Sequence, residues 1–184
     1  MPILAKEPTI YPECLLSEPA ELAPDRNWWA VYTKPRQEKS LARQLVQLKV
    51  PFYLPLVEKT SLVQGRKMRS FLPLFGSYLF LLGTEQERGV ALATNRIVQT
   101  LPVPDRARMT GDLCHVQQLI EQGAPLTLES RLSPGQKVRV KSGALMGVEG
   151  VIVSRRGEDR LVVAVKFLQQ GVSITIQDFQ VEPI

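Results

Sequence analysis

Few residues of this sequence could support covalent or metal chemistry. Cys14 and Cys114 are 100 positions apart, and the single histidine, His115, follows the second cysteine. A Cys-His pair can act as nucleophile and base, but neighbouring residues of a helix point in different directions and no Asp or Asn partner is evident. A half-buried helical cysteine is the simpler interpretation. The sequence therefore predicts no catalytic residue, no metal site, no cofactor and no enzymatic activity.

Positive charge is the second feature with chemical meaning, and it is concentrated in one stretch. The net charge is +5, and residues 34–70 contain nine Lys or Arg against two acidic side chains, Glu38 and Glu58. Such a local field attracts polyanions such as nucleic acids, although a solubilising surface is an equally simple explanation. No apolar run approaches the roughly 20 residues of a membrane-spanning helix, so we expect a cytoplasmic protein.

A proline-rich, acidic segment precedes the elements that carry this charge. Residues 1–26 include five prolines and five acidic side chains, which predicts a flexible arm. Trp-Trp-Ala-Val-Tyr at 28–32 predicts a buried strand, and a helix should follow from near Pro35 to Pro51. The helix should have an apolar side formed by Leu41, Leu45 and Leu48, and a cationic side formed by Arg36, Lys39 and Arg43.

The following segments predict a sheet with two more helices. Two strand-like runs, 60–63 and 68–72, flank Gln-Gly-Arg-Lys at 64–67, which predicts a basic hairpin. The apolar run 74–82 predicts a central strand. The other expected elements are a helix at 85–93, a strand at 97–101 and a helix at 110–122, which Thr110 caps and whose Leu113, Val116 and Ile120 face inward. This order predicts an α+β domain over residues 27–123, a mainly antiparallel sheet flanked by helices.

A linker at 124–133 separates this domain from a different pattern at 134–184. Here short alternating runs are divided by turn residues, and we expect five strands, at 137–141, 148–154, 160–167, 172–176 and 179–181. So few short strands favour a small closed β-barrel of the SH3-like type. Many residues at 162–165 and 172–176 are β-branched, which favours a stable barrel over a helical alternative form.

Both domains resemble one protein family. Pro-Gly-Gln-Lys-Val-Arg-Val at 134–140, with Gly-Val-Glu-Gly-Val-Ile at 147–152, is similar to the KOW motif. Trp-Trp-Ala-Val-Tyr at 28–32 and Pro-Leu-Phe-Gly-Ser-Tyr-Leu-Phe at 73–80 resemble the N-terminal domain of the NusG transcription elongation factors. The spacing from Tyr32 through Gly65 to Phe80 resembles the specialised RfaH-like paralogues of that family.

The resemblance implies a monomeric antitermination factor that suppresses pausing and termination by RNA polymerase. The clamp helices of the largest polymerase subunit would contact four aromatic residues, Tyr32, Phe75, Tyr78 and Phe80. The gate loop would contact Arg88 and Gly89, within the Glu87–Val90 segment that replaces the family's Thr-rich one. The non-template DNA strand would meet Lys34, Arg36, Lys39, Arg43 and Arg96, with the hairpin residues Arg66, Lys67 and Arg69 as a further contact for phosphate or upstream duplex.

The second domain would recruit a partner through Phe167 and Leu168, either the termination factor Rho or a small-subunit ribosomal protein. A second interpretation remains open at this point. KOW barrels and basic α+β domains also occur in ribosomal and RNA-binding accessory proteins, so such a role is the alternative.

Overall fold

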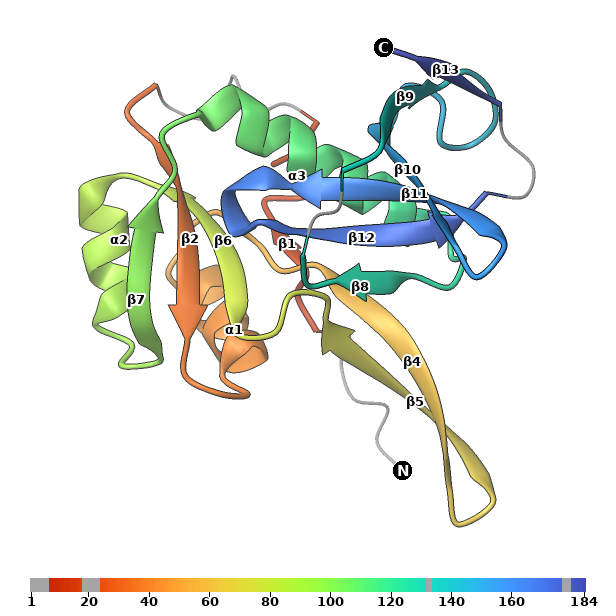
Figure 1. The fold of residues 1–184 in the computed structure, drawn as a ribbon. Coiled ribbons are helices and arrows are strands. Elements are labelled where there is room, and N and C mark those ends of the chain that lie inside the picture. The colour runs from red at the N-terminus through yellow and green to blue at the C-terminus, as the bar shows by residue number, and fades with distance from the viewer. Residues whose placement is uncertain (1–6, 18–23, 132–133, 177–179) are drawn as a thin grey trace. The chain divides into compact units, whose positions relative to one another are not determined.

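The computed structural model describes residues 7–17, 24–131, 134–176 and 180–184. The chain forms two compact units, Met1–Arg106 and Ala107–Ile184 (Figure 1). The sequence predicted a first domain that continues to residue 123. The boundary between the units instead precedes almost all of the helix predicted at 110–122, so this helix belongs to the second unit.

The first unit contains a five-stranded sheet in which all pairs of neighbours are antiparallel. Its strands, in spatial order, are β1 (Ile10–Tyr11), β3 (Phe52–Tyr53), β6 (Tyr78–Gly83), β2 (Asn27–Thr33) and β7 (Ile97–Pro102). Together with helices α1 (Glu38–Gln47) and α2 (Glu85–Leu92), it forms the α+β structure predicted from the sequence.

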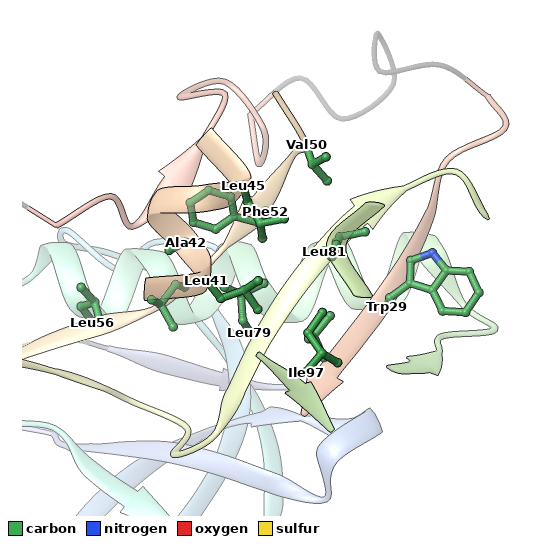
Figure 2. Packing of buried hydrophobic residues seen from close by; sticks show 13 residues of the cluster. Trp29, Leu41, Ala42, Leu45, Val50, Phe52, Leu56, Leu79, Leu81 and Ile97 are labelled. Carbon is green, nitrogen blue, oxygen red and sulfur yellow. The ribbon is translucent and has the colours of Figure 1, made fainter. Parts of the chain in front are cut away.

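One face of this sheet forms the main apolar core of the unit. Successive side chains of a strand point to opposite faces, so Trp29 and Val31 of β2 share a face with Leu79 and Leu81 of β6. These side chains cluster with Leu41, Ala42 and Leu45 of α1 and with Ala91 of α2, as Figure 2 shows for most of them. The burial of this face fixes which side of β2 and β6 points away from α1.

Helix α1 is shorter than the sequence predicted, and one of the three leucines predicted to be buried is exposed to solvent. Leu41 and Leu45 are fully buried, but Leu48 is 43% exposed and lies at the C-cap. The helix ends there because the chain turns at Lys49, whose φ of 56° leaves the helical conformation. Arg36 precedes the helix with a positive φ of 61°, so it does not belong to the helical surface of Lys39 and Arg43.

Helix α2 is fixed at its start by a capping box and an ion pair. The Thr84 hydroxyl accepts a hydrogen bond from the backbone N–H of Glu87, whose carboxylate accepts one from the N–H of Thr84. The same carboxylate pairs with Arg26 over 2.6 Å. Burial alone would raise the pKa of Glu87, but the hydrogen bonds from Arg26 and Thr84 outweigh it and lower the pKa below its ordinary value.

The N-terminal segment departs from the predicted flexible arm. Residues 10 and 11 form β1, which extends the sheet beyond β3, and the N–H of Leu54 donates to the carbonyl of Thr9 over 2.6 Å. Leu15 is fully buried, and Tyr11 packs against the core. Prolines and acidic residues do not exclude a two-residue strand whose partner, β3, is distant in sequence. The rest of the predicted arm lies largely outside the described residues.

The predicted basic hairpin is present. Strands β4 (Leu56–Val63) and β5 (Arg66–Pro73) pair with each other in a separate two-stranded sheet. Its turn has positive φ at Gln64 and Gly65, which glycine adopts without strain. Every side chain from residue 58 to residue 72 is exposed.

All of helix α3 (Arg106–Glu121) except its first residue belongs to the second unit. This helix starts four residues before the predicted Thr110 cap, and it buries Met109, Leu113, Val116 and Leu119, while Ile120 is only half-buried. Of the three residues predicted to face inward, Leu113 and Val116 are therefore buried as expected. None of the helices among the described residues is long and apolar enough to cross a membrane.

The remainder of this unit is an antiparallel sheet of six strands. In spatial order they are β13 (Val181–Pro183), β9 (Gln136–Val140), β10 (Glu149–Arg155), β11 (Glu158–Val165), β12 (Gln170–Thr175) and β8 (Thr127–Glu129). Strand β8 comes from the predicted linker, and a short 3₁₀ helix, Lys166–Leu168, joins β11 to β12. Closure of this sheet into an SH3-like barrel stays a prediction.

One glycine of the KOW-like segment is required by close packing of the backbone. A Cβ at Gly150 would lie 2.6 Å from the carbonyl oxygen of Val162, in the neighbouring strand β11. Any side chain there would separate β10 from β11 and break their ladder. The strand pair that includes this motif therefore depends on glycine.

The carboxylate of Glu87 should make the stability of the first unit depend on pH. We expect Glu87→Gln to lower the free energy of unfolding by about 1–2 kcal/mol at pH 7, because it removes an ion pair and weakens the capping box. Since the folded-state pKa of Glu87 is lowered, its contribution is present above the unfolded-state pKa and is lost as the pH falls through the lower folded-state pKa.

Urea unfolding followed by tryptophan fluorescence measures this effect, since both tryptophans, Trp28 and Trp29, lie in the first unit. Glu85→Gln is the matched control. Glu85 begins the same helix, but its side chain is 70% exposed and its pair with Arg88 lies at the surface, so we expect a loss below about 0.5 kcal/mol. Equal losses for the two variants at pH 7 would contradict this account.

Candidate functional site

The four aromatic residues predicted to bind a partner lie together in the first unit. Tyr32 pairs with Tyr78 across β2 and β6, and Phe80 lies two residues further along β6 on the same face. Phe75 packs against Phe80, with ring centroids 6.1 Å apart in an edge-to-face geometry. This face of the sheet is the one opposite α1.

The four differ in exposure. Phe75 and Phe80 are fully buried. Tyr32 is 39% exposed and Tyr78 is half-buried, and their rings lie 5.3 Å apart at an angle of 56°. Tilted aromatic pairs of this kind are favourable and hold both rings in place. The two tyrosines are thus the accessible part of the aromatic cluster, whereas the two phenylalanines are its buried part.

Cationic side chains lie at the same end of the sheet as the tyrosine pair. Lys34 and Arg36 follow the end of β2, where Tyr32 is exposed between the buried residues Val31 and Thr33. Arg96 precedes β7, and its carbonyl accepts a hydrogen bond from the N–H of Lys34 over 2.9 Å. The sheet topology therefore brings three separate basic residues to the end of the sheet that carries the aromatic pair.

These cations differ in how freely they could bind an anion. Arg36 is exposed. The ammonium of Lys34 donates to the side-chain oxygen of Asn95 over 3.0 Å, and the guanidinium of Arg96 donates to Gln44 and Gln37 of the α1 region. Neutral amide partners fix the direction of a guanidinium without neutralising its charge. The positive field at this end of the sheet is therefore retained.

The loop that carries Tyr78 is attached to the start of α1. The buried Glu38 carboxylate accepts a hydrogen bond from the backbone N–H of Ser77 over 2.8 Å. Ser77 has a positive φ of 62°, and its carbonyl accepts from the N–H of Thr33 over 2.8 Å. Glu38 thus holds the turn that places Tyr78 opposite Tyr32, a role that sequence reasoning missed because the contact joins residues 39 positions apart.

Two more predicted nucleic-acid ligands lie on α1. Lys39 is half-buried near its start, and Arg43 is exposed one turn later. Both carboxylate oxygens of Glu7 contact Nη1 of Arg43 at 2.7 Å. Such a surface ion pair contributes little stability and can be replaced by another anion.

Of the two residues predicted to contact a gate loop, Arg88 and Gly89, the first already makes contacts within the first unit. The guanidinium of Arg88 lies 4.8 Å from the centre of the Trp29 ring, donates to Thr100 over 3.1 Å and pairs with Glu85 over 2.7 Å. Gly89 is exposed. Arg88 therefore holds α2 against the sheet, and its contact with any partner stays a prediction.

The hairpin residues Arg66, Lys67 and Arg69 are exposed and lie apart from the tyrosine pair, at and near the tip. Arg69 pairs with Glu58 over 3.3 Å, with side-chain exposures of 77% and 43%. In the second unit, Phe167 and Leu168 are half-buried in the 3₁₀ turn before the left-handed residue Gln169. These two side chains leave part of their apolar surface accessible at one turn.

The Cys114-His115 pair lies on α3 of the second unit, and both side chains are half-buried. Burial raises the pKa of the Cys114 thiol. Burial also lowers the pKa of His115, which the Glu149 and Asp112 carboxylates only partly oppose. Both shifts favour the neutral forms, whereas a nucleophilic cysteine needs its thiolate.

The comparisons with known proteins bear on the first unit. Residues 26–110, somewhat less than half of the chain, match the family model described as "NusG: Transcription termination factor nusG". No curated protein matches the chain. The matched region contains the aromatic residues, the basic residues and the hairpin described above, and this match supports membership of the NusG family.

Proposed function

We propose that this chain is a transcription elongation and antitermination factor that binds RNA polymerase and the DNA of the transcription bubble. The observation that carries this proposal is the tyrosine pair, Tyr32 and Tyr78, beside the cationic residues at one end of the sheet. The family match suggests a transcription factor role and an interaction with RNA polymerase.

The tyrosine pair is the part of the aromatic cluster that we propose to bind the clamp helices of the largest polymerase subunit. Aromatic side chains supply a large contact area at low entropic cost and often form the energetic centre of an interface. Phe75 and Phe80, being buried, would act by supporting the tyrosines. A factor that binds the closed clamp more tightly than the open one shifts the polymerase away from paused states without any bond being made or broken.

The basic residues beside the tyrosines would bind the non-template DNA strand. Lys34, Arg36 and Arg96 would contact phosphates, and an exposed Arg36 could also stack on an unpaired base. Lys39 and Arg43 would extend the contact along α1, where phosphate would replace Glu7 as the partner of Arg43. The hairpin cations would reach a second segment of nucleic acid.

The second unit would recruit a partner through Phe167 and Leu168, either Rho or a small-subunit ribosomal protein. We also propose that the protein is not an enzyme. The alternative function is that of a ribosome-associated or RNA-binding accessory protein. Co-purification at matched salt separates the two, because exclusive association with ribosomes would contradict the elongation-factor proposal.

The docking surface is tested by Tyr32→Ala combined with Tyr78→Ala. We expect affinity for RNA polymerase to fall at least tenfold, because truncation of an aromatic anchor costs about 2 kcal/mol or more. In transcription across a pause and a terminator, this variant should no longer shorten the pause or increase read-through. Polymerase binding and transcript lengths are the measurements.

Met146→Ala is the control, since Met146 is 66% exposed and lies in the second unit. Tryptophan fluorescence verifies that the double variant is folded. A folded double variant with wild-type activity would show that the tyrosine pair is not the docking surface. Unchanged pausing and read-through at saturating wild-type protein would contradict the proposed function itself.

The nucleic-acid contact is tested by Arg36→Gln combined with Lys39→Gln. We expect weaker binding of single-stranded DNA, and a salt dependence of log K that is less steep by roughly 0.7 for each phosphate that the variant no longer neutralises. Fluorescence anisotropy over a series of salt concentrations measures both. Lys137→Gln combined with Lys141→Gln removes the same charge from exposed positions of the second unit, so an equal effect in that control would mean that only net charge matters.

A further inference from the structure

One face of the sheet in the second unit carries apolar side chains that are only partly covered. Val163 and Val165 of β11 are buried. Because side chains alternate along a strand, Val162 and Ala164 point to the other face. The ladder with β10 places Val151 opposite Val162, on that same face. Val151 and Ala164 are half-buried, so part of this apolar face is accessible.

A cavity of about 420 Å³ lies between this face and helix α3, and all of its lining residues belong to the second unit. Arg108, Asp112 and His115 line it from the helix, at intervals of four and three residues that place them on one side of α3. The Asp112 carboxylate accepts a hydrogen bond from the backbone N–H of Lys166 over 3.0 Å, which attaches the helix to the end of β11. The volume is within the range of small-molecule pockets, roughly 300–1,000 Å³.

The helix wall of this cavity is open at Gly111. This residue lines the cavity, and a Cβ built on it would meet no heavy atom within 4 Å outside the helix backbone. The opposite wall is the apolar face formed by Val151, Val162 and Ala164. An open space between a helix backbone and an apolar sheet face suits a flat ring, because both sides of the ring are then removed from water.

Positive charge prevails at the rim of the cavity. Arg108 on the helix and Lys166 at the end of β11 both line it and are exposed. Of the two carboxylates in the lining, Glu149 is paired with Arg139 over 2.5 Å, and Asp112 accepts the Lys166 N–H described above. Guanidinium and ammonium groups form charge-assisted hydrogen bonds with phosphate, so the rim favours an anionic group.

We propose that this cavity binds a small phosphate monoester with a flat apolar body, of the class of nucleoside monophosphates. The flat ring lies between Gly111 and the apolar sheet face, and the phosphate contacts Arg108 and Lys166. A bound ligand would therefore join α3 to the sheet. Every contact lies within the second unit, so the ligand binds whether or not the first unit contacts RNA polymerase, and the site is separate from the proposed function.

The single histidine makes the site directly observable. His115 is the one histidine of the sequence and lines the cavity, so the imidazole proton resonances of the full, untagged chain report on a ligand there. We expect AMP and GMP to shift these resonances in a saturable way. Adenosine and inorganic phosphate should each bind about tenfold more weakly or worse, because neither makes both sets of contacts.

Two variants separate the ring contact from the phosphate contact. Gly111→Leu fills the open space and should weaken binding of AMP about tenfold or more, while leucine favours the helix more than glycine does. Gln118→Leu is the matched control, since Gln118 is exposed on the same helix and is not part of the lining. Arg108→Gln combined with Lys166→Gln should weaken binding of AMP about tenfold and leave that of adenosine unchanged.

Circular dichroism verifies that the variants are folded. Imidazole resonances that neither AMP nor GMP shifts would overturn the inference. So would a folded Gly111→Leu variant that binds AMP as tightly as the wild type does. Equal affinity of the wild type for AMP and for inorganic phosphate would show that the cavity binds anions without regard to a flat body, and this too would contradict the assignment.

Discussion

The antiparallel pairing of β2 with β6 is the interaction on which the candidate site depends. It places Trp29 and Val31 beside Leu81 and Leu79 on the face that α1 buries, and it leaves Tyr32 opposite Tyr78 on the other face. Since side chains alternate along a strand, a slip of one residue would turn the tyrosines toward the core and the core residues outward. The large apolar surface that α1 buries therefore also determines which aromatic residues can meet a partner.

The turns at this end of the sheet hold the tyrosines and the basic residues in place on its surface. Ser77 is held by Glu38 on one side and by Thr33 on the other, and Lys34 is held by Arg96. Each contact joins segments that are distant in sequence, so the charges and the tyrosines are fixed relative to one another before any partner arrives. Preorganisation of this kind lowers the entropic cost of binding. The hairpin is a contrast, because its exposed residues are held mainly by the pairing of its own two strands.

Several parts of the structure follow from local patterns in the sequence. The aromatic and β-branched run at 28–32, the apolar run at 74–82, the glycine at the hairpin tip and the helical pattern at 85–93 each led to an element that forms close to where it was expected. These patterns are local, because the period of a strand or helix and the φ of a turn are properties of a few neighbouring residues. The same holds for the excess of Lys and Arg between residues 34 and 70, which tertiary structure does not change.

Tertiary structure decided what those patterns left open. It placed residues 10 and 11 on the edge of β3, made a strand of residues 127–129 in the predicted linker, and buried Phe75 and Phe80 while leaving Tyr32 accessible. Each outcome depends on a partner far away in the chain, and composition does not identify such partners. The sequence by itself therefore determined the types of the longer elements, the charge, and the change from a mixed helix-and-strand pattern to short alternating strands along the chain. Packing determined which aromatic and basic side chains share a surface, because exposure is a property of neighbours in space.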